Sequence, residues 1–357
     1  MAVTLADVAA RAGVSSATVS RVLNGNYPVA GSTRERVQRA VEDLDYVVNG
    51  QARGLAAATS DLVGVLVNDV ADPFFGLIAS AVQAEISDPS APGGGKLAVV
   101  CNTGGSPEAE LTYLTLLERQ RAAGVVITGG AVEGAEHSAA VAARLARLAE
   151  SGTRIVLCGR PPLEPATGIP VATVAFDNRG GARRLTEHLL SLGHRRIGYV
   201  AGPADRTTTR HRLEGHRAAL ADHDLPSTGP AVDRLTVHGS YDRSSGYDAA
   251  LELLRREPAL TAVIAANDTV ALGVCAAVRD QGLSIPDDVS VAGFDDLPFS
   301  VDTAPALTTV RIPLQEAGAR AGRLVMGRQA PPPGGLATIR TELMVRASTA
   351  RPRAGSA

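Results

Sequence analysis

A segment near the N-terminus carries side chains whose types and spacing suit contacts to double-stranded DNA. Ala17, Arg21 and Asn24 are separated by four and three residues, so a helix presents them on one face. The Arg21 guanidinium has the geometry to donate two hydrogen bonds to O6 and N7 of guanine in the major groove, where Ser16 and Ala17 would also point. The short hydroxyl side chains that suit phosphate oxygens are those of Ser15, Thr18, Ser20 and Thr33. We therefore predict a surface that reads DNA.

The apolar residues around this segment predict three short helices within residues 1–46. They recur at helical spacing three times, with a break at Gly13. Thr4 suits the N-cap of the first helix, and Ser32 with Glu35 has the spacing of a capping box for the third. Two helices joined by a short turn form the helix-turn-helix arrangement, in which the second helix enters the major groove.

The distribution of charge supports this surface, although the whole chain is nearly neutral at a formal charge of −2. Lys96 is the only lysine, so almost all basic residues are arginines. Residues 1–40 hold five arginines and two acidic residues, which gives this stretch a net charge of +3. The alternative is a three-helix module whose polar face meets only water. The local excess of arginine argues against that alternative, because phosphate attracts cations.

Beyond residue 60 the pattern changes to one of buried parallel strands, after a connector over residues 47–60 that is rich in alanine and glycine. Continuous apolar runs, typical of strands buried on both faces, occur at Leu62–Val67, Leu97–Cys101, Val125–Ile127, Ile155–Cys158, Ile197–Val200, Ala262–Ala265 and Val289–Gly293. Helical patterns between them include Glu108–Arg121, Ser138–Glu150, Arg179–Leu192 and Thr269–Gln281. The alternation predicts an α/β core over residues 61–345, with two doubly wound parallel-sheet lobes and a ligand cleft. We predict a disordered tail over residues 346–357.

Several classes of protein are excluded by what the sequence lacks. No apolar run reaches the length of a membrane span, and no signal peptide is evident, so we expect a cytoplasmic protein without membrane contact. Cys101, Cys158 and Cys275 stand apart among apolar neighbours, which predicts buried thiols. Glycine-rich nucleotide motifs, a nucleophile elbow and a set of metal ligands are all missing, so we predict no cofactor, no metal and no enzyme activity.

The run from Thr4 to Asn24, TLADVAARAGVSSATVSRVLN, resembles the N-terminal headpiece of LacI/GalR-type repressors. The resemblance continues, in the order that the family has them, at residues 33–37, 44–46, 72–75, 192–198, 285–291 and 307–310. It implies a helix-turn-helix headpiece and a core like that of periplasmic binding proteins. The implied function is that of a homodimeric transcriptional repressor that binds a pseudo-palindromic operator under the control of a small-molecule effector.

The resemblance also assigns roles within the connector. The segment near Asn49–Ala58 resembles the hinge helix of the family, which folds on DNA and enters the minor groove. Leu55 matches the leucine that wedges into the central base step, and Ala52 lies one turn earlier. Such an apolar wedge unstacks a base step and bends the duplex. The alternative for Leu55 is ordinary packing between domains, and Val48 departs from the proline that the family often has there.

In the core, the resemblance implies a cleft that combines aromatic surfaces with planar hydrogen-bonding groups. The matching effector-binding positions are Phe74, Thr128, Arg206, Thr208, Arg212, Tyr241 and Asp268. Arg212 and Asp268 suit vicinal hydroxyls, because a guanidinium donates in pairs and a carboxylate accepts in pairs. The alternative for this pair is an ion pair that joins the two lobes.

The effector implied by the resemblance is a sugar or a sugar derivative. Many sugar-responsive members have aspartate where this chain has Gly159, so one acceptor for a hydroxyl is missing. Two alternatives stay open: a sugar phosphate, since Arg206, Arg210 and Arg212 would suit an anion, and a purine-like co-repressor. A more remote alternative is a solute-binding protein without a DNA function.

Overall fold

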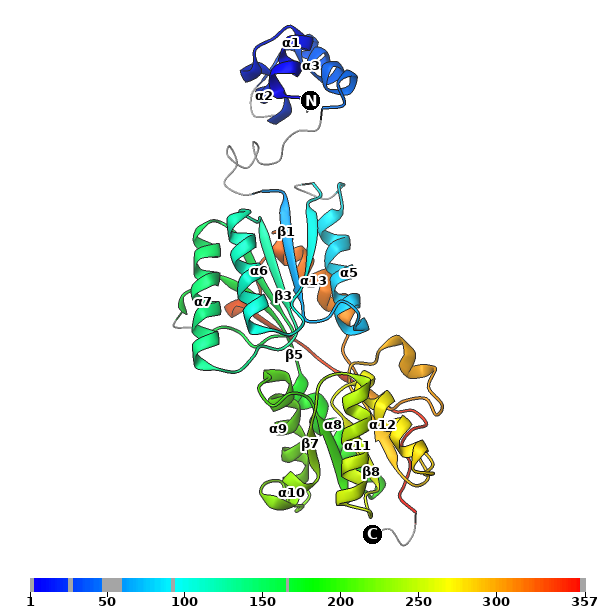
Figure 1. Cartoon of the computed structure of the whole chain (residues 1–357). Coiled ribbons are helices and arrows are strands. Elements are labelled where there is room, and N and C mark those ends of the chain that lie inside the picture. Colours follow the sequence, from blue (N-terminus) through cyan, green and yellow to red (C-terminus); the bar gives the residue numbers. More distant parts are fainter. Residues whose placement is uncertain (1–2, 25–27, 47–59, 91–93, 165–166, 354–357) are drawn as a thin grey trace. The chain divides into compact units, whose positions relative to one another are not determined.

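The computed structural model describes residues 3–24, 28–46, 60–90, 94–164 and 167–353, and the chain divides into two compact units (Figure 1). The first unit is Met1–Asp61 and the second is Leu62–Ala357. The boundary between them falls at the end of the predicted connector. Ala52 and Leu55, the two residues predicted to enter the minor groove, lie outside the described residues.

The described part of the N-terminal unit is helical, as the sequence predicts. Its helices are α1 (Leu5–Ala12), α2 (Ser16–Asn24) and α3 (Gly31–Asp43). Their apolar faces meet in a small core in which Val8, Val19 and Val37 are fully buried. Gly13 ends α1 in the left-handed conformation, at φ 63°, which glycine adopts without steric cost. Helices α1 and α2, with the short turn between them, therefore form a helix-turn-helix.

The first and third helices begin in different ways. The Thr4 hydroxyl accepts a hydrogen bond from the Asp7 backbone N–H at 3.3 Å, and the Asp7 carboxylate accepts one from the Thr4 N–H at 2.8 Å. The predicted N-cap of α1 is thus confirmed. The predicted capping box over residues 32–35 is wrong, because α3 begins at Gly31 and the residue before it, Ala30, has no side chain that could cap the helix.

The first lobe of the core is a parallel sheet of six strands in the order β11-β5-β4-β3-β1-β2. The strands are β1 (Leu62–Val67), β2 (Leu97–Asn102), β3 (Gly124–Thr128), β4 (Arg154–Cys158), β5 (Val171–Phe176) and β11 (Leu336–Ile339). One face of the sheet is covered by α5 (Pro73–Ser87) and α13 (Leu314–Val325). The other face is covered by α6 (Pro107–Arg119) and α7 (Ala135–Glu150).

Strand β1 shows why the strand sequences of this lobe are mostly apolar on both faces. Val63 and Val65 belong to the core on the side of α5 and α13, whereas Leu66 belongs to the core on the side of α6 and α7. Because helices cover both faces, neither face needs polar residues. A Cβ atom on Gly64 would lie 2.3 Å from Leu117 Cδ1, so this glycine allows α6 to approach the sheet.

The second lobe is built around a smaller parallel sheet in the order β7-β6-β8-β9. Its strands are β6 (Ile197–Ala201), β7 (Thr236–His238), β8 (Ala262–Ala265) and β9 (Ser290–Ala292). The helices α8 (Asn178–Leu192) and α9 (Thr207–Ala221) pack together on one face. On the other face lie α11 (Arg243–Arg256) and α12 (Asp268–Asp280), and the short α10 (Pro230–Arg234) precedes β7. The predicted α/β core with two parallel sheets is confirmed.

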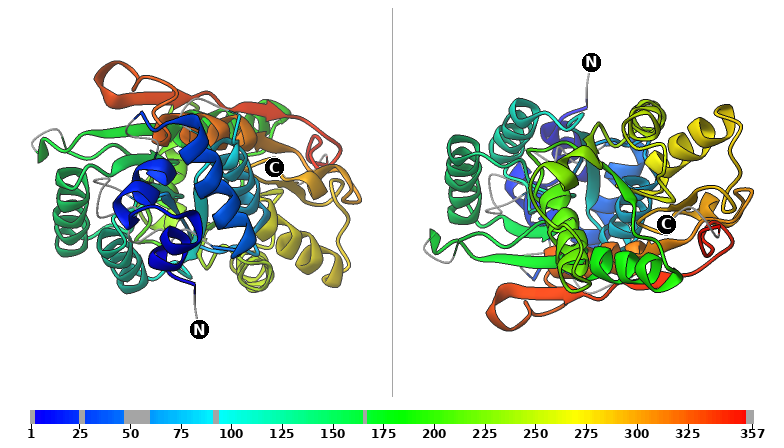
Figure 2. Two further views of the ribbon diagram at one scale, coloured as in Figure 1. Left: turned by 90° about the horizontal axis from the view of Figure 1, so that it is seen from above. Right: turned by 90° about the horizontal axis from the view of Figure 1, so that it is seen from below.

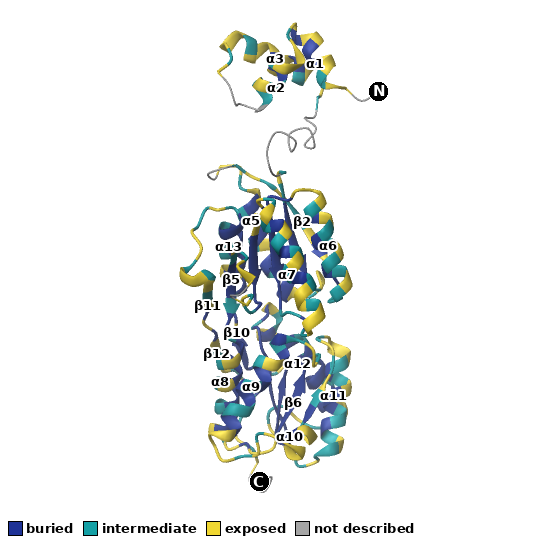
Figure 3. Cartoon of the chain, turned by 90° about the vertical axis from the view of Figure 1, so that its left-hand side faces the viewer, coloured by how far each residue is buried: buried dark blue, intermediate teal, exposed yellow. Residues whose placement is uncertain are grey.

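The chain passes between the two lobes after β5, after β10 and after β11. Strands β10 (Thr309–Arg311) and β12 (Glu342–Met344) form an antiparallel pair, and short 3-10 helices occur at Pro298–Val301 and Pro333–Gly335. Figure 2 shows these C-terminal strands, orange to red, running along one side of the core. Figure 3 shows that the central strands of both sheets are buried while the outer helix faces are exposed. The three cysteines are buried free thiols, as predicted.

The structure corrects the predicted disordered tail for residues 346–353, while residues 354–357 of that prediction lie outside the described residues. Ser348 is fully buried, and its hydroxyl donates to the Val291 carbonyl at 2.6 Å. In return the Val291 N–H donates to the Ser348 carbonyl at 2.9 Å. The His194 ring donates from Nε2 to the Ala350 carbonyl at 2.8 Å. Residues 346–353 therefore complete the second lobe, and their small polar side chains serve this pairing.

Candidate functional site

The exposed face of α2 carries residues that were predicted to read DNA. Ser16, Ala17 and Arg21 are exposed, whereas Val19 on the opposite face is fully buried. This arrangement follows from the helical period, because burying Val19 turns the positions two residues on either side of it outward. Helix α2 ends at Asn24, whose side chain lies outside the described part of the structure.

The predicted phosphate-binding hydroxyls differ in their surroundings. The Ser15 hydroxyl accepts from the Thr18 backbone N–H at 3.2 Å, as an N-cap does, and lies 2.9 Å from the Thr18 hydroxyl. Ser15 is exposed, while Thr18, Ser20 and Thr33 are half-buried. Ser15 therefore stabilises the start of α2 while remaining accessible to a phosphate.

Unpaired arginines add positive charge to this unit. Arg34, Arg36 and Arg39 on α3 are exposed and have no ion-pair partner among the described residues. In contrast, Arg11 is paired with Asp43 at 2.6 Å. Exposed cations of this kind neutralise phosphates and release counterions. The unit thus combines cations with an outward-facing helix in a helix-turn-helix.

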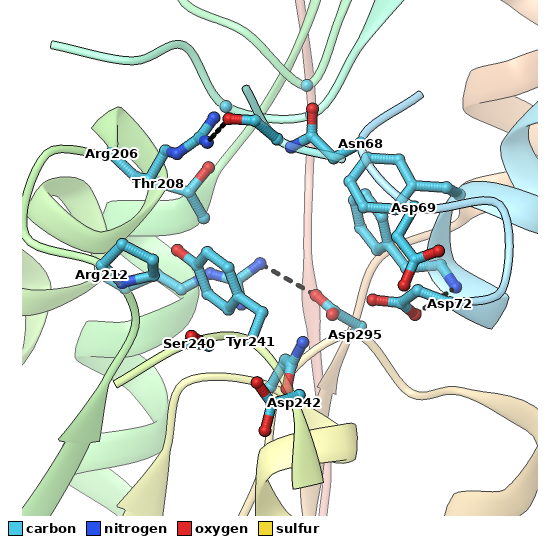
Figure 4. Close-up of a pocket in the computed structure, with 18 of the residues that line it drawn as sticks. Asn68, Asp69, Asp72, Arg206, Thr208, Arg212, Ser240, Tyr241, Asp242 and Asp295 are labelled. Carbon is cyan, nitrogen blue, oxygen red and sulfur yellow. Dashed lines mark hydrogen bonds and ion pairs between the residues drawn. The ribbon is translucent and has the colours of Figure 1, made fainter. Parts of the chain in front are cut away.

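In the core, a cavity of about 350 Å³ lies where strands from both lobes end (Figure 4). In parallel sheets the ligand crevice forms outside the carboxyl ends of the strands. The segments after β1 to β5 line the cavity from the first lobe, and those after β6 to β9 line it from the second. Its volume is within the range of ligand-binding pockets. The polar lining residues are Asn68, Asp69, Asp72, Asn178, Arg206, Thr208, Arg212, Ser240, Asp242, Asn267 and Asp295.

Arg212 is the centre of the polar network in this cavity. It is 4% exposed, and its guanidinium donates to Asn178 Oδ1 at 2.9 Å, to the Ala266 carbonyl at 2.5 Å and to Asp295 Oδ1 at 2.9 Å. The guanidinium carbon also lies 3.7 Å from the centre of the Phe294 ring, a cation–π contact. These contacts fix the guanidinium in one orientation, and of its five N–H groups they leave two for a ligand.

Asp295 faces Arg212 from the turn after β9. Its φ angle is 106°, which is unusual for a residue other than glycine and costs about 1–3 kcal/mol. The backbone N–H of Asp295 holds the turn by donating to the Val310 carbonyl at 2.7 Å. Burial raises the pKa of the Asp295 carboxyl to about 8, although the nearby Arg212 charge acts to lower it. Its second oxygen has no hydrogen-bond partner among the described residues, so it can accept from a ligand.

Aromatic rings form the apolar wall of the cavity. The rings of Phe74 and Phe176 meet edge to face at 6.3 Å between centroids. Tyr241 enters from the second lobe, and its hydroxyl lies 2.7 Å from the Thr209 hydroxyl. Gly159, at φ 83°, lies under Phe176, since a Cβ atom there would be 2.8 Å from the ring. The chain therefore has an aromatic contact at the position where aspartate was expected in many sugar-responsive relatives.

Two contacts at the edge of the cavity join the lobes. The Arg206 guanidinium from the second lobe donates to the Gly105 carbonyl of the first (Figure 4). The Thr207 backbone N–H, at the start of α9, donates to the Ala131 carbonyl at 3.0 Å. A ligand in the cavity would therefore touch two lobes that are already in contact.

Five of the predicted effector-binding residues line the cavity, and two do not. Those that line it are Phe74, Arg206, Thr208, Arg212 and Tyr241. Thr128 is 1% exposed and donates to the Leu66 carbonyl at 2.8 Å, behind the cavity wall. Asp268 is fully buried, and its carboxylate accepts from the Leu297 N–H at 2.8 Å and from the hydroxyls of Ser300 and Thr309 at 2.6 Å. The predictions for Thr128 and Asp268 are corrected, because their hydrogen-bonding groups are used inside the protein.

Asn178 and Asp295, which were not predicted from the sequence, bind Arg212 in place of Asp268, and Asn267, also not predicted, lines the cavity. A signal for their region was available, because each stands two or three residues after a strand of a parallel sheet, but Asp268 also stands three residues after β8. That position is where the crevice forms. Asn267 also caps α12 by accepting from the Val270 N–H at 2.8 Å, so its side chain is held at the cavity wall.

Two further findings concern other classes of function. Within the described ranges, no helix is long and apolar enough to cross a membrane. The same residues contain no group of three or more histidine, cysteine, aspartate or glutamate side chains placed to hold a metal ion.

Comparisons with known proteins agree with this architecture. Residues 4–49 match the family model described as bacterial regulatory proteins, lacI family, and residues 186–349 match a periplasmic binding protein-like domain. The chain is 35% identical to the HTH-type transcriptional regulator GalR of Escherichia coli (strain K12) over 323 residues, 90% of this chain and 88% of that protein. It is 34% identical to the regulator CelR of Thermobifida fusca over 364 residues, 97% of this chain and 98% of that one.

Solved structures give the same result. The lac repressor dimer bound to operator and the anti-inducer ONPF matches with a TM-score of 0.78 and 28% identity, over 98% of this chain and 100% of that one. The complex of the regulator CelR with cellobiose matches with a TM-score of 0.66 and 32% identity, over 97% and 99%. The chain therefore belongs to the LacI family of bacterial regulatory proteins, which are transcriptional regulators and not enzymes.

Proposed function

We propose that this regulator represses transcription by binding operator DNA as a homodimer, and that a sugar in the core cleft controls the binding. Relatives in this family include a repressor dimer on its operator and a regulator in complex with cellobiose. The observation that carries the proposal is the Arg212 network inside an aromatic cavity between two lobes. A repressor of bacterial genes acts in the cytoplasm, where its operator is.

The cavity offers a sugar both kinds of contact that it needs. The two free N–H groups of Arg212 and the second oxygen of Asp295 place donors beside an acceptor, which suits vicinal hydroxyls. This pair takes the role that the sequence assigned to Arg212 and Asp268. The rings of Phe74, Phe176 and Tyr241 offer apolar surfaces to the C–H face of a sugar ring.

On the DNA side, we assign base contacts to Ser16, Ala17, Arg21 and Asn24, and phosphate contacts to Ser15, Thr18, Ser20 and Thr33. Leu55, with Ala52, is proposed as the minor-groove wedge of the connector. The exposed face of α2 supports the first assignment, the family match over residues 4–49 supports the second, and the full-length similarity to regulators of this family supports the third.

The control of DNA binding by the sugar follows from thermodynamic linkage. A sugar that binds one arrangement of the two lobes more tightly shifts the chain toward that arrangement, and the operator affinity changes by the same coupling free energy. Such couplings are typically about 1–3 kcal/mol, or about 5- to 150-fold in affinity.

The proposal is tested by calorimetric titration of the full chain with cellobiose, galactose and ribose. One of these sugars is expected to saturate the protein at one molecule per protomer. Arg212→Lys should weaken that binding at least about tenfold, because lysine lacks the planar fork. Arg183→Lys, on exposed α8, is the matched control and should leave the affinity unchanged.

The second experiment first selects, from random DNA sequences, a duplex that binds the full chain. The affinity of the chain for this duplex is then measured by fluorescence anisotropy. Adding the bound sugar should change the affinity for this duplex within the range given above. A chain that binds none of the sugars, or whose DNA affinity ignores the bound sugar, contradicts the proposed function.

A further inference from the structure

The charged residues of the cavity give it an excess of negative charge. Four carboxylates line it, those of Asp69, Asp72, Asp242 and Asp295, against the two guanidinium groups of Arg206 and Arg212 (Figure 4). Asp295 accepts a hydrogen bond from Arg212 at 2.9 Å and holds that guanidinium in place. The other three carboxylates outnumber the two guanidinium groups even where burial, which raises the pKa of Asp295 to about 8, keeps the Asp295 carboxyl protonated.

The arginines that the sequence offered to an anion make contacts within the protein, and Arg210 lies outside the cavity lining. Arg206 donates to the Gly105 carbonyl. Arg210 points away to two ion pairs outside the cavity lining, with Glu133 at 2.6 Å and Glu214 at 2.9 Å. The sequence analysis kept an anionic effector as an alternative because of Arg206, Arg210 and Arg212. The two ion pairs of Arg210 outside the lining remove its part of that support.

The helix N-termini at the cavity are also occupied. The N-terminus of a helix is a natural site for a phosphate, because its first N–H groups lack partners. At α5, the Asp72 carboxylate accepts from the Phe74 N–H at 2.9 Å. At α11, the Asp242 carboxylate accepts from the Ser245 N–H at 2.8 Å. Both helices therefore present a carboxylate where a phosphate would bind.

The N-terminus of α9 is covered from the first lobe. The Thr207 N–H donates to the Ala131 carbonyl, and the Thr207 hydroxyl accepts from the Ala131 N–H at 3.0 Å. The next residue, Thr208, lies against Gly130. A Cβ atom on Gly130 would be 2.3 Å from the Thr208 hydroxyl oxygen. This contact leaves no room for a phosphate between the two segments.

We infer that the cleft selects an uncharged polyhydroxylated ligand and rejects the phosphorylated form of the same ligand, with Asp69, Asp72 and Asp242 as the residues that determine this selectivity. Hydroxyls can donate to these carboxylates, whereas a phosphate would face three like charges, which outnumber the guanidinium groups of Arg206 and Arg212 in the cavity lining. The inference rests on the proposed function and narrows its effector from sugar derivatives in general to neutral sugars.

The test compares each sugar with its phosphate ester on the full chain. Calorimetric titrations at pH 7.5 use galactose with galactose 6-phosphate, ribose with ribose 5-phosphate, and cellobiose with cellobiose 6-phosphate. For the pair whose neutral member binds, the ester should bind at least about tenfold more weakly, because like charges placed together cost several kcal/mol. An ester that binds as tightly as its neutral sugar, or more tightly, overturns the inference while the proposed function stands. If neither member of any pair binds, the proposed function fails and the inference fails with it.

A triple variant tests the three named residues. Asp69→Asn, Asp72→Asn and Asp242→Asn together remove the charges but keep side chains that cap helices as well as aspartate does. The ratio of the dissociation constants, ester over neutral sugar, should fall at least about tenfold in this variant. The control carries the same change at three exposed positions outside the cavity, Asp233→Asn, Asp248→Asn and Asp302→Asn, and should keep the ratio of the unmodified chain. Equal ratios in the two triple variants would assign the selectivity to net charge and overturn the role of the three residues.

Discussion

The two regions that contact other molecules are built in opposite ways. The face of α2 is exposed, and its neighbours on α3 include arginines without ion-pair partners among the described residues. In the core cleft, Arg212 and Asp295 are nearly fully buried and hold each other in place. The first region presents its groups on an exposed surface, whereas the second fixes its groups in a buried network before the partner arrives. A substitution in the cleft should therefore change both the stability of the protein and its affinity for the effector. A substitution on the exposed face of α2 should change only the affinity for DNA.

The largest effect is expected for Arg212→Ala. Removing one partner of a buried ion pair leaves Asp295 buried and unpaired, which should lower the free energy of unfolding by about 3–5 kcal/mol. Effector binding should be lost as well. The exposed Arg183, paired with Glu187 and Asp222, provides the control, and Arg183→Ala should cost at most about 1 kcal/mol. Urea unfolding of the core measures both, and equal costs for the two variants would contradict the contrast between the regions.

Arg21→Ala tests the exposed region. It should weaken binding to the selected duplex by about 1–3 kcal/mol and relax the preference at one symmetric base pair, with the unfolding free energy nearly unchanged. Arg21→Lys separates charge from geometry, because lysine keeps the charge but cannot donate as a planar fork. It should retain affinity for random DNA and lose the base preference. An equal loss on all sequences in both variants would mean that Arg21 contacts only phosphate.

The two regions also differ in how far the sequence predicts them. The face of α2 follows from helical periodicity, since burying Val19 is enough to turn Ala17 and Arg21 outward. In the cleft, Asn267 and Asp268 are adjacent, and only the first lines the cavity. The dihedral angles of the turn after β8 decide which of them faces the ligand, and no apolar pattern encodes those angles.

The core shows the same limit at the level of whole elements. The long apolar strands, such as β1 and β3, are recognisable because both of their faces are covered. Strands β10 and β12 have three residues each and mix polar with apolar side chains, so their pairing depends on contacts between residues far apart in the chain. The same holds for Ser348, whose burial against Val291 turned a supposed tail into part of the second lobe.

Stability should depend on pH through the cleft and not through the α2 face. The pKa of Asp295 is raised above its ordinary value of 3.8 to about 8. The protonated carboxyl therefore contributes to the free energy of unfolding in full below about pH 4, and this contribution is lost as the pH rises through 8. Buried His216, with its pKa lowered to about 3, acts in the opposite direction, but only below about pH 6.5. Between pH 6.5 and 8.5 the unfolding free energy should therefore fall, by at most about 1.4 kcal/mol per pH unit for this one proton.

Asp295→Asn isolates that contribution, because asparagine can still accept from Arg212 but does not titrate. Urea unfolding at half-unit steps of pH should show a flatter profile for this variant than for the unmodified chain. Two parallel profiles would mean that Asp295 is ionised throughout this range and that Arg212 outweighs the effect of burial.

The smallest effects come from a matched pair of threonines, one behind the cavity wall and one in it. Thr128→Val removes the buried hydrogen bond to the Leu66 carbonyl, so it should cost about 1 kcal/mol of unfolding free energy and leave the sugar affinity unchanged. Thr208→Val, at the cavity itself, should weaken the sugar several-fold at nearly constant stability. Calorimetry gives the sugar affinity of both variants, and urea unfolding gives their stability. Thr128→Val should lower only the stability, and Thr208→Val should lower only the affinity. If Thr128→Val weakened the sugar as much as Thr208→Val, the boundary drawn here between the wall of the cleft and its lining would be in the wrong place.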